Sequence, residues 1–218
     1  MTADKLYARL RRSGFFWHST PSPNAIAIIQ AGEITPNRGQ FNETFSQSLS
    51  SWSRHLGGVS LFDFDGASDE DFDVHHTDYS IFGPVPGRVL IKIDRGALQP
   101  SNLIVPTQFH ATPPDPRLGG EPAYKRMRVP YLEAVHIGPV PARAFLGYHL
   151  TAYDDDGNLQ SQEFDPGPDV AETMQAVIDT WTEEDTRRKA ERHARGDMRL
   201  EEVLADVAAD RRRDLKGR

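Results

Sequence analysis

Cysteine is entirely absent from this sequence. Its absence excludes a disulfide framework, a thiolate zinc site and a cysteine nucleophile. The sequence also has no apolar run approaching the roughly 18 residues that a membrane-spanning helix needs, and no signal-peptide h-region near Met1. We therefore expect a cytoplasmic protein that does not interact with membranes.

Basic residues are outnumbered by acidic ones. The chain has 25 Lys and Arg against 32 Asp and Glu, which gives a formal net charge of −7. Broad, sequence-independent binding to nucleic acid relies on neutralising phosphates with Lys and Arg, so the overall charge argues against it while leaving room for a local basic groove. With 218 residues, 38% of them hydrophobic, the chain is long enough to bury a substantial core.

Several motifs that would identify a chemistry are missing as well. There is no Gly-x-Gly-x-x-Gly, no phosphate loop and no His-Glu-x-x-His. The adjacent pair His75–His76 lies in an acidic stretch, but neighbouring side chains diverge on a strand or a helix. This pair therefore favours a solvated loop, and we predict no metal site.

The first ordered motif is predicted to be a strand, a polar turn and a buried helix. Phe15–His18 has the aromatic content of a short strand, which places His18 rigidly at its end, beside a turn rich in hydroxyl groups. Asn24 stands where it would cap the helix Ala25–Ala31, and Gly32 is suited to end that helix with a positive φ.

The remaining chain alternates short apolar segments with loops. Predicted strands are Val59–Phe62, Arg88–Asp94, Leu103–Val105, Tyr131–Ile137 and the hairpin Phe145–Tyr153 with Leu159–Phe164. Predicted helices are Thr2–Ser13, Ser46–Leu56, Asp169–Trp181, with an apolar stripe from Val170 to Trp181, and a charged Glu183–Arg213 split at Gly196. Few strands are separated by the long helices of βαβ units, so the pattern favours an α+β fold with a mixed or antiparallel sheet.

Glu133 is the most informative charged residue because it interrupts an apolar strand. Alternation puts it on one face with Tyr131, Val135 and Ile137, the more apolar face of that strand. Burial there would raise its pKa unless a cation or hydrogen-bond donors favoured the charged form. A functional and a structural role both remain open for Glu133. For His18 alone, the simpler interpretation is a half-buried histidine bonded to backbone.

Together these segments resemble the ADP-ribosyltransferase fold, and in particular the DarT-like toxins, which ADP-ribosylate single-stranded DNA. The pattern His18-x-Thr20-x-x-x-Asn24, followed by Ile28–Ile29 and Gly32, is similar to that family's first strand, turn and helix.

Three later segments carry the rest of the resemblance. Val59–Phe62 is similar to the family's second core strand, and Val89–Asp94 to the strand before its target-facing loop. Leu132–Ile137 with the turn Gly138–Pro141 is similar to the strand that bears the catalytic glutamate.

The resemblance implies a split, mixed or antiparallel sheet with short helices. It implies a catalytic domain over residues 1–168 and a C-terminal helical extension over residues 169–218. It also implies NAD as a substrate, Glu133 and Arg54 as catalytic residues (Arg38 being a poorer match to the family's arginine), and no metal. The residues implied in binding NAD are His18, Ser19, Thr20, Asn24, Ser60 and Phe62, with Tyr79 or Phe45 as alternatives to Phe62 for stacking on nicotinamide.

The implied chemistry agrees with these residue types. Cleavage of the nicotinamide–ribose bond develops oxocarbenium character, which a carboxylate such as that of Glu133 can stabilise. We therefore expect a toxin or phage-defence enzyme that transfers ADP-ribose to a macromolecule, with single-stranded DNA or RNA favoured over protein. The C-terminal helix is a candidate contact for an antitoxin or for oligomerisation.

Three alternatives remain open from the sequence. One is a metal-independent ribonuclease toxin that uses His18, Arg54 and His136. Another is a non-enzymatic module that binds a partner through its helical tail. The third is an NAD glycohydrolase, whose acceptor is water.

Overall fold

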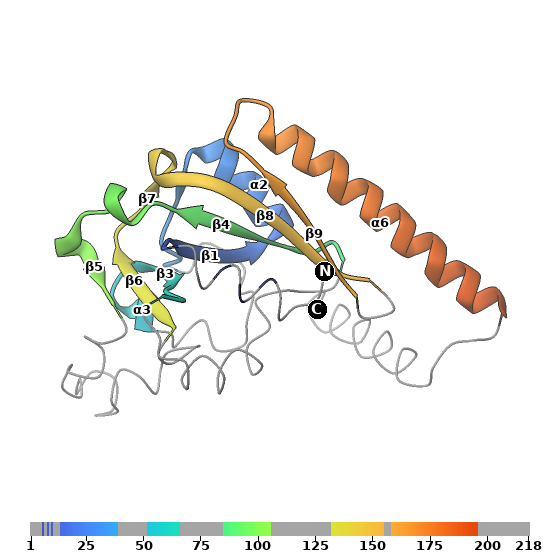
Figure 1. Ribbon diagram of the computed structural model, residues 1–218, viewed down its shortest axis with the longest axis horizontal. Coiled ribbons are helices and arrows are strands. Elements are labelled where there is room, and N and C mark those ends of the chain that lie inside the picture. The colour runs from blue at the N-terminus through green and yellow to red at the C-terminus, as the bar shows by residue number, and fades with distance from the viewer. Residues whose placement is uncertain are drawn as a thin grey trace, which may run out of the picture.

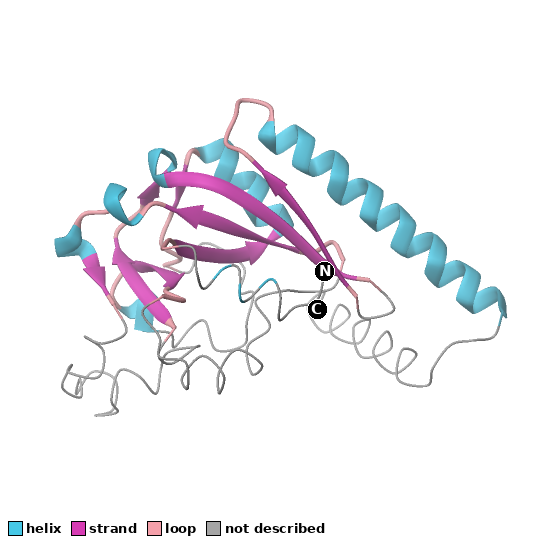
Figure 2. Ribbon diagram, in the orientation of Figure 1, coloured by secondary structure: helices cyan, strands magenta, loops and turns pink. Residues whose placement is uncertain are grey.

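The computed structural model describes residues 14–38, 52–65, 85–105, 132–154 and 158–195, together with Leu6, Ala8 and Leu10. These ranges form an α+β arrangement in which a twisted sheet is flanked by helices (Figures 1 and 2). The strands of this sheet pair in antiparallel fashion, which confirms the predicted fold class at this level.

Within the described ranges, the main sheet has seven strands in the order β5-β6-β3-β1-β4-β8-β9. Their bounds are β1 Phe16–Pro21, β3 Gly58–Phe62, β4 Arg88–Ile93, β5 Leu103–Ile104, β6 Glu133–Ile137, β8 Phe145–Tyr153 and β9 Leu159–Phe164. A second sheet pairs β2, Glu33–Ile34, with β7, Val140–Pro141. The predicted hairpin is confirmed at both strands, and β3, β4 and β6 lie within one or two residues of their predicted bounds.

Three α-helices and three short 3₁₀ turns complete the described fold. The α-helices are α2 Ser22–Ala31, α3 Trp52–His55 and α6 Val170–Arg195, and the 3₁₀ turns are η2 Arg95–Ala97, η3 Pro100–Asn102 and η6 Ala142–Ala144. None of the described helices is long and apolar enough to cross a membrane.

The strand-to-helix joint at β1 differs from the prediction. β1 does not end at His18 but continues through Pro21, because all six of its residues pair with β4. Helix α2 then begins at once, with Pro21 as its N-cap residue. Asn24 is exposed within the first turn and is not the cap, so that prediction was wrong. Gly32 ends the helix at φ 73°, as predicted.

Side-chain alternation along the strands creates two apolar cores. Phe16, Leu61 and Val89 belong to the larger core, which also contains Ala25 of α2 and Met174 of α6. The neighbouring residues Trp17, Phe62 and Leu90 belong to a smaller core, where Leu6, Leu10, Phe64, Leu132 and Leu159 also pack. The two cores hold the sheet between them.

Helix α6 is one continuous helix of 26 residues, where the sequence predicted a division near Thr182. The region has no Gly or Pro to break the helix, and the Thr182 hydroxyl donates to the Ile178 carbonyl at 2.7 Å. The predicted stripe is confirmed, since Val170, Met174 and Ile178 are buried in the larger core and Val177 and Trp181 pack against it. The first half of α6 thus shares a core with the sheet.

Some predictions fall outside the described residues. They concern most of the helix Thr2–Ser13, the first part of Ser46–Leu56, the pair His75–His76, the aromatic candidates Phe45 and Tyr79, and the chain beyond Arg195.

Candidate functional site

The sheet is joined weakly between β1 and β3. β1 pairs with β4 at six positions, but its register with β3 has a single pair, Trp17 with Phe62. This junction divides the sheet into a three-strand half, β5-β6-β3, and a four-strand half, β1-β4-β8-β9. Beyond this pair, toward Pro21 on β1 and Gly58 on β3, the residues of β1 and β3 no longer pair.

His18 occupies the place where this pairing stops. If the register of β1 with β3 continued past Trp17, Ser19 would stand opposite Ser60. Instead the His18 ring reaches across, and its Nδ1 lies 2.9 Å from the Ser60 carbonyl oxygen. A side chain has replaced the backbone ladder at this point.

Ser60 also links the junction to β6. Its hydroxyl donates to Glu133 Oε1 at 2.6 Å, within the three-strand half. Glu133 is 2% exposed and stands opposite Phe62 in the register of β3 with β6. The structure therefore brings together His18, Ser60 and Glu133, which the sequence places on three separate strands.

The histidine and the carboxylate approach Ser60 from different sides. Alternation places the Ser60 hydroxyl and Glu133 on the face of the sheet that carries Phe62, whereas His18 has Phe16 and Thr20 as its same-face neighbours. His18 reaches Ser60 through the separation between the two halves. A ligand that contacts both His18 and Glu133 must therefore lie where β1 and β3 diverge.

Arg88, which was not among the predicted site residues, is a buried cation beside β1. Its Nε donates to the Ser19 hydroxyl at 3.0 Å and its Nη2 to the Ser19 carbonyl at 3.3 Å. These bonds hold β1 extended past His18, which explains why Ser19 and Thr20 are not a turn. The signal in the sequence was an arginine that opens a largely apolar strand, Arg88–Ile93.

The environment of His18 keeps its ring neutral. Burial lowers its pKa from 6.5 to about 4; the hydrogen bond to Ser60 opposes this lowering, and the positive charge of Arg88 adds to it. Because a carbonyl oxygen only accepts, Nδ1 must carry the ring proton. Nε2 is then an acceptor, and within the described ranges His18 makes no second hydrogen bond.

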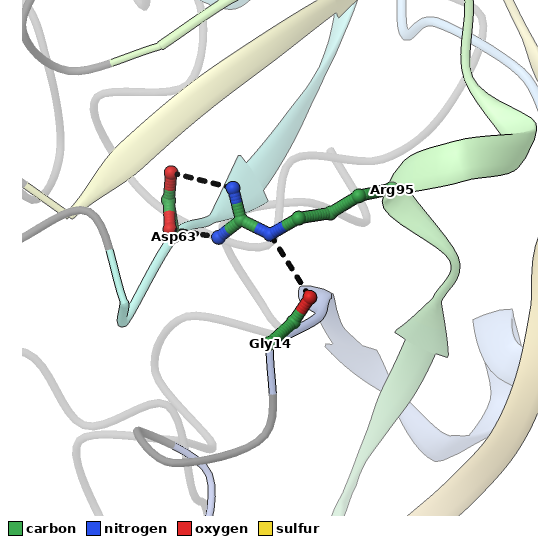
Figure 3. Close-up of polar contacts among 3 residues, drawn as sticks. All are labelled: Gly14, Asp63 and Arg95. Carbon is green, nitrogen blue, oxygen red and sulfur yellow. Dashed lines mark hydrogen bonds and ion pairs between the residues drawn. The ribbon is translucent and has the colours of Figure 1, made fainter.

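A second polar cluster lies where β1 begins and β3 ends, on the other side of the Trp17–Phe62 pair from His18 (Figure 3). Arg95, on η2 after β4, donates through two nitrogens to the Asp63 carboxylate, with Arg95 Nη1 to Asp63 Oδ2 at 3.2 Å. Its Nε donates to the Gly14 carbonyl at 3.1 Å, and its guanidinium lies 4.0 Å from the centre of the Phe16 ring. This pair was not predicted from the sequence, although Asp63 and Arg95 each follow an apolar strand closely.

The other predicted site residues have varied positions. Thr20 is buried on β1, and Asn24 is exposed on α2. Phe62 is buried and stacks in parallel on Phe64, with ring centres 5.8 Å apart. Arg54 is partly buried on α3, which packs against β3 and β6, and Arg38 is exposed near Gly57. Of these five, Phe62 stands opposite Glu133 in the β3–β6 register, and the roles of all five stay predictions.

His136, a residue of the ribonuclease alternative, is directed elsewhere. It pairs with Val59 in the β3–β6 register, and its ring nitrogen Nδ1 lies 3.3 Å from the carbonyl of Gly138. Alternation puts it on the face opposite Glu133. In the described part of the chain, no three His, Asp or Glu side chains are grouped as metal ligands.

The junction thus offers a neutral imidazole acceptor, a buried carboxylate and a serine that bonds to both. Such a set can accept hydrogen bonds from sugar hydroxyls and stabilise positive charge that develops on a bound ligand. Comparison with known proteins adds no relative: no protein-family model, no curated protein and no solved structure matches this chain.

Proposed function

We propose that this protein is an NAD-dependent mono-ADP-ribosyltransferase of the toxin or phage-defence type. It transfers ADP-ribose from NAD to a macromolecule, with nucleic acid favoured over protein. The observation that supports this proposal is the hydrogen-bonded series His18, Ser60 and Glu133 at the divergence of β1 and β3. The resemblance drawn from the sequence required these three residues to meet in one place.

Glu133 is proposed as the catalytic carboxylate. Loss of nicotinamide leaves positive charge on the ribose, and a carboxylate in a water-poor site stabilises that charge more strongly than one in water. The hydroxyl of Ser60 fixes the carboxylate through Oε1, so its orientation is set before the ligand binds. The same carboxylate can hold the ribose 2′-hydroxyl or take a proton from the acceptor.

His18 is proposed to bind NAD, not to exchange protons. With its pKa lowered to about 4, the ring stays neutral at physiological pH. Nδ1 is committed to Ser60, so Nε2 is the atom that accepts a hydrogen bond from a ribose hydroxyl. Arg88, which bonds to the neighbouring Ser19, adds positive charge beside His18 that would favour the phosphates of a bound dinucleotide.

The test is to incubate the protein with NAD labelled in its adenine moiety, together with single-stranded DNA, RNA or protein. Released nicotinamide and transferred label are both measured. We expect Glu133→Gln, which removes the charge and keeps the shape, to lower the rate of transfer by about 10²–10⁴-fold. Glu191→Gln, on the exposed surface of α6, is the matched control and should leave the rate unchanged.

The outcomes separate the alternatives. Label on an acceptor supports the proposal and identifies the acceptor class, whereas nicotinamide release without label indicates a glycohydrolase. Cleavage of RNA in the absence of NAD would indicate the ribonuclease alternative. Transfer that is unchanged in a folded Glu133→Gln variant would overturn the proposed mechanism.

A further inference from the structure

The ion pair of Asp63 and Arg95 connects the two halves of the sheet. Asp63 directly follows β3 in the three-strand half, and Arg95 follows β4 in the four-strand half. The third member of the cluster, Gly14, precedes β1. Figure 3 shows the Arg95 side chain extending from η2 across to the end of β3, with the start of β1 beside it.

The geometry of this cluster constrains both halves. A guanidinium that donates through two nitrogens to one carboxylate fixes distance and orientation together, which a single hydrogen bond does not. Asp63 is 2% exposed, so its carboxylate has little water available to replace Arg95. The bond to the Gly14 carbonyl and the Phe16 ring hold the same guanidinium against the start of β1.

Few bonds separate the Asp63–Arg95 cluster from Glu133. The backbone N–H of Asp63 donates to the Leu132 carbonyl at 2.6 Å. The next pair along the ladder is Phe62 with Glu133. Arg95 is therefore connected to Glu133 through Asp63, whose backbone N–H bonds to Leu132, the residue that precedes Glu133.

Within the main sheet, little backbone pairing joins the two halves; β2 and β7 also pair, between the segments that follow α2 and β6. Between β1 and β3 the ladder has the single pair Trp17 with Phe62, next to which Arg95 and Asp63 make their contact. On the other side of this pair the His18 ring spans to Ser60. Any rotation of one half about the Trp17–Phe62 pair would change both contacts.

From these contacts we infer that Arg95 and Asp63 are a positioning pair, which fixes the angle between the half-sheets and thereby the placement of Glu133 relative to His18. The consequence for catalysis rests on the proposed function, but the geometric statement does not. Neither residue has to touch NAD. A merely stabilising ion pair would support the fold without controlling the His18–Ser60 contact.

The test combines three variants at the cluster with one control. Arg95→Gln removes the charge, Arg95→Lys keeps the charge but cannot make the two-nitrogen contact, and Asp63→Asn removes the partner charge. Arg188→Gln is the matched control: Arg188 is 37% exposed against 33% for Arg95, and its carboxylate partners Asp154 and Glu184 lie on the four-strand half and on α6.

The first readout is the ¹⁵N spectrum of the His18 ring, with thermal unfolding measured beside it. In the wild type we expect a protonated Nδ1, an unprotonated Nε2 and a pKa near 4. In Arg95→Lys we expect the two nitrogen signals to move toward each other and the pKa to rise toward 6.5, because the ring loses its fixed partner and gains water. If Arg95→Gln or Asp63→Asn does not fold, Arg95→Lys decides the question.

The second readout is turnover of NAD. Misplacement of a catalytic group by about 1 Å costs up to about 100-fold, so we expect kcat/KM of Arg95→Lys to fall by about 10- to 100-fold, with Arg188→Gln within about twofold of the wild type. Unchanged His18 signals in folded Arg95→Lys would overturn the positioning role, whatever the activity. Shifted His18 signals in a protein without transferase activity would sustain the positioning role and refute the proposed function.

Discussion

The β8–β9 hairpin and the β1–β3 junction belong to one sheet but are built differently. The hairpin pairs residue for residue from Tyr148 with Phe164 to Tyr153 with Leu159. The junction has one such pair, and side chains make the other contacts described across it: the His18 ring to Ser60 and the Arg95 guanidinium to Asp63.

The difference extends to where charge is buried. In β9, an edge strand, the polar residues Gln162 and Glu163 are both exposed, although they lie on opposite faces of the strand. At the junction the carboxylates of Asp63 and Glu133 are each 2% exposed. Burying charged groups costs stability even when they are paired, which is the expected signature of a functional site on an otherwise consistent fold. The comparison separates scaffold from candidate site.

Among substitutions that should leave the junction intact, the largest loss of stability is expected in the scaffold, where α6 packs on the sheet. Met174 on α6 is fully buried in the larger core, so Met174→Ala should lower the free energy of unfolding by about 2–5 kcal/mol. Chemical denaturation measures this, with Gln175→Ala, an exposed neighbour on the same helix, as the control. The His18 ring signals should not move in Met174→Ala; movement would show that scaffold and junction are coupled.

A pH effect of intermediate size is expected at the junction. The folded-state pKa of His18, about 4, lies below its ordinary value of 6.5, so the unfolded chain binds more protons between these two pH values. The stability associated with neutral His18 is therefore complete above pH 6.5 and is lost as the pH falls toward 4, by at most about 3 kcal/mol.

The variant His18→Asn tests this dependence. Its amide can still donate to the Ser60 carbonyl, but it does not titrate. The difference in unfolding free energy between wild type and His18→Asn should vary with pH only over that window. A difference that stays constant from pH 4 to 7 would contradict a His18 ring that the fold keeps neutral.

The smallest expected effect is the difference in stability cost between substituting one glycine from each region. A Cβ on Gly58 of β3 would lie 2.5 Å from Val135 Cγ1 and 2.8 Å from the His136 carbonyl oxygen, whereas a Cβ on Gly147 of β8 would lie 3.3 Å from the Phe164 carbonyl oxygen. Gly58→Ala should therefore cost about 1–3 kcal/mol and shift β3 against β6, while Gly147→Ala should cost less. Unfolding midpoints measure both, and equal costs would contradict the tighter packing of β3 on β6.

Local sequence was sufficient to predict the scaffold. The hairpin has apolar strands around a turn rich in Asp, Gly and Asn, and the α6 stripe repeats at helical spacing, so each can be recognised within its own segment. Glu133 was noticed for a similar reason, since a carboxylate in an apolar strand is a local anomaly. Such features can be predicted without knowing which other segments pack against them.

The contacts of the junction could not be predicted in this way. Ser19, Thr20 and Pro21 have the composition of a turn, yet pairing with β4 and the bonds from Arg88 keep them extended, because tertiary contacts override weak local preference. The pair of Asp63 and Arg95 depends on β1 lying between β3 and β4 in the sheet. The order of strands in the sheet depends on long-range pairing and cannot be predicted from any single segment.

The continuity of the chain has a further consequence for the junction. The hairpin turn is closed by contacts between residues four positions apart, such as Asp154 with Asn158. Ser60 and Glu133 are 73 positions apart, and Gly14 and Arg95 are 81. Closing such long loops has an entropic cost that only a completed sheet offsets. A fragment containing β8, β9 and α6 includes both partners of each of its local contacts, whereas no fragment lacking β1, β3 or β6 includes all the residues of the junction.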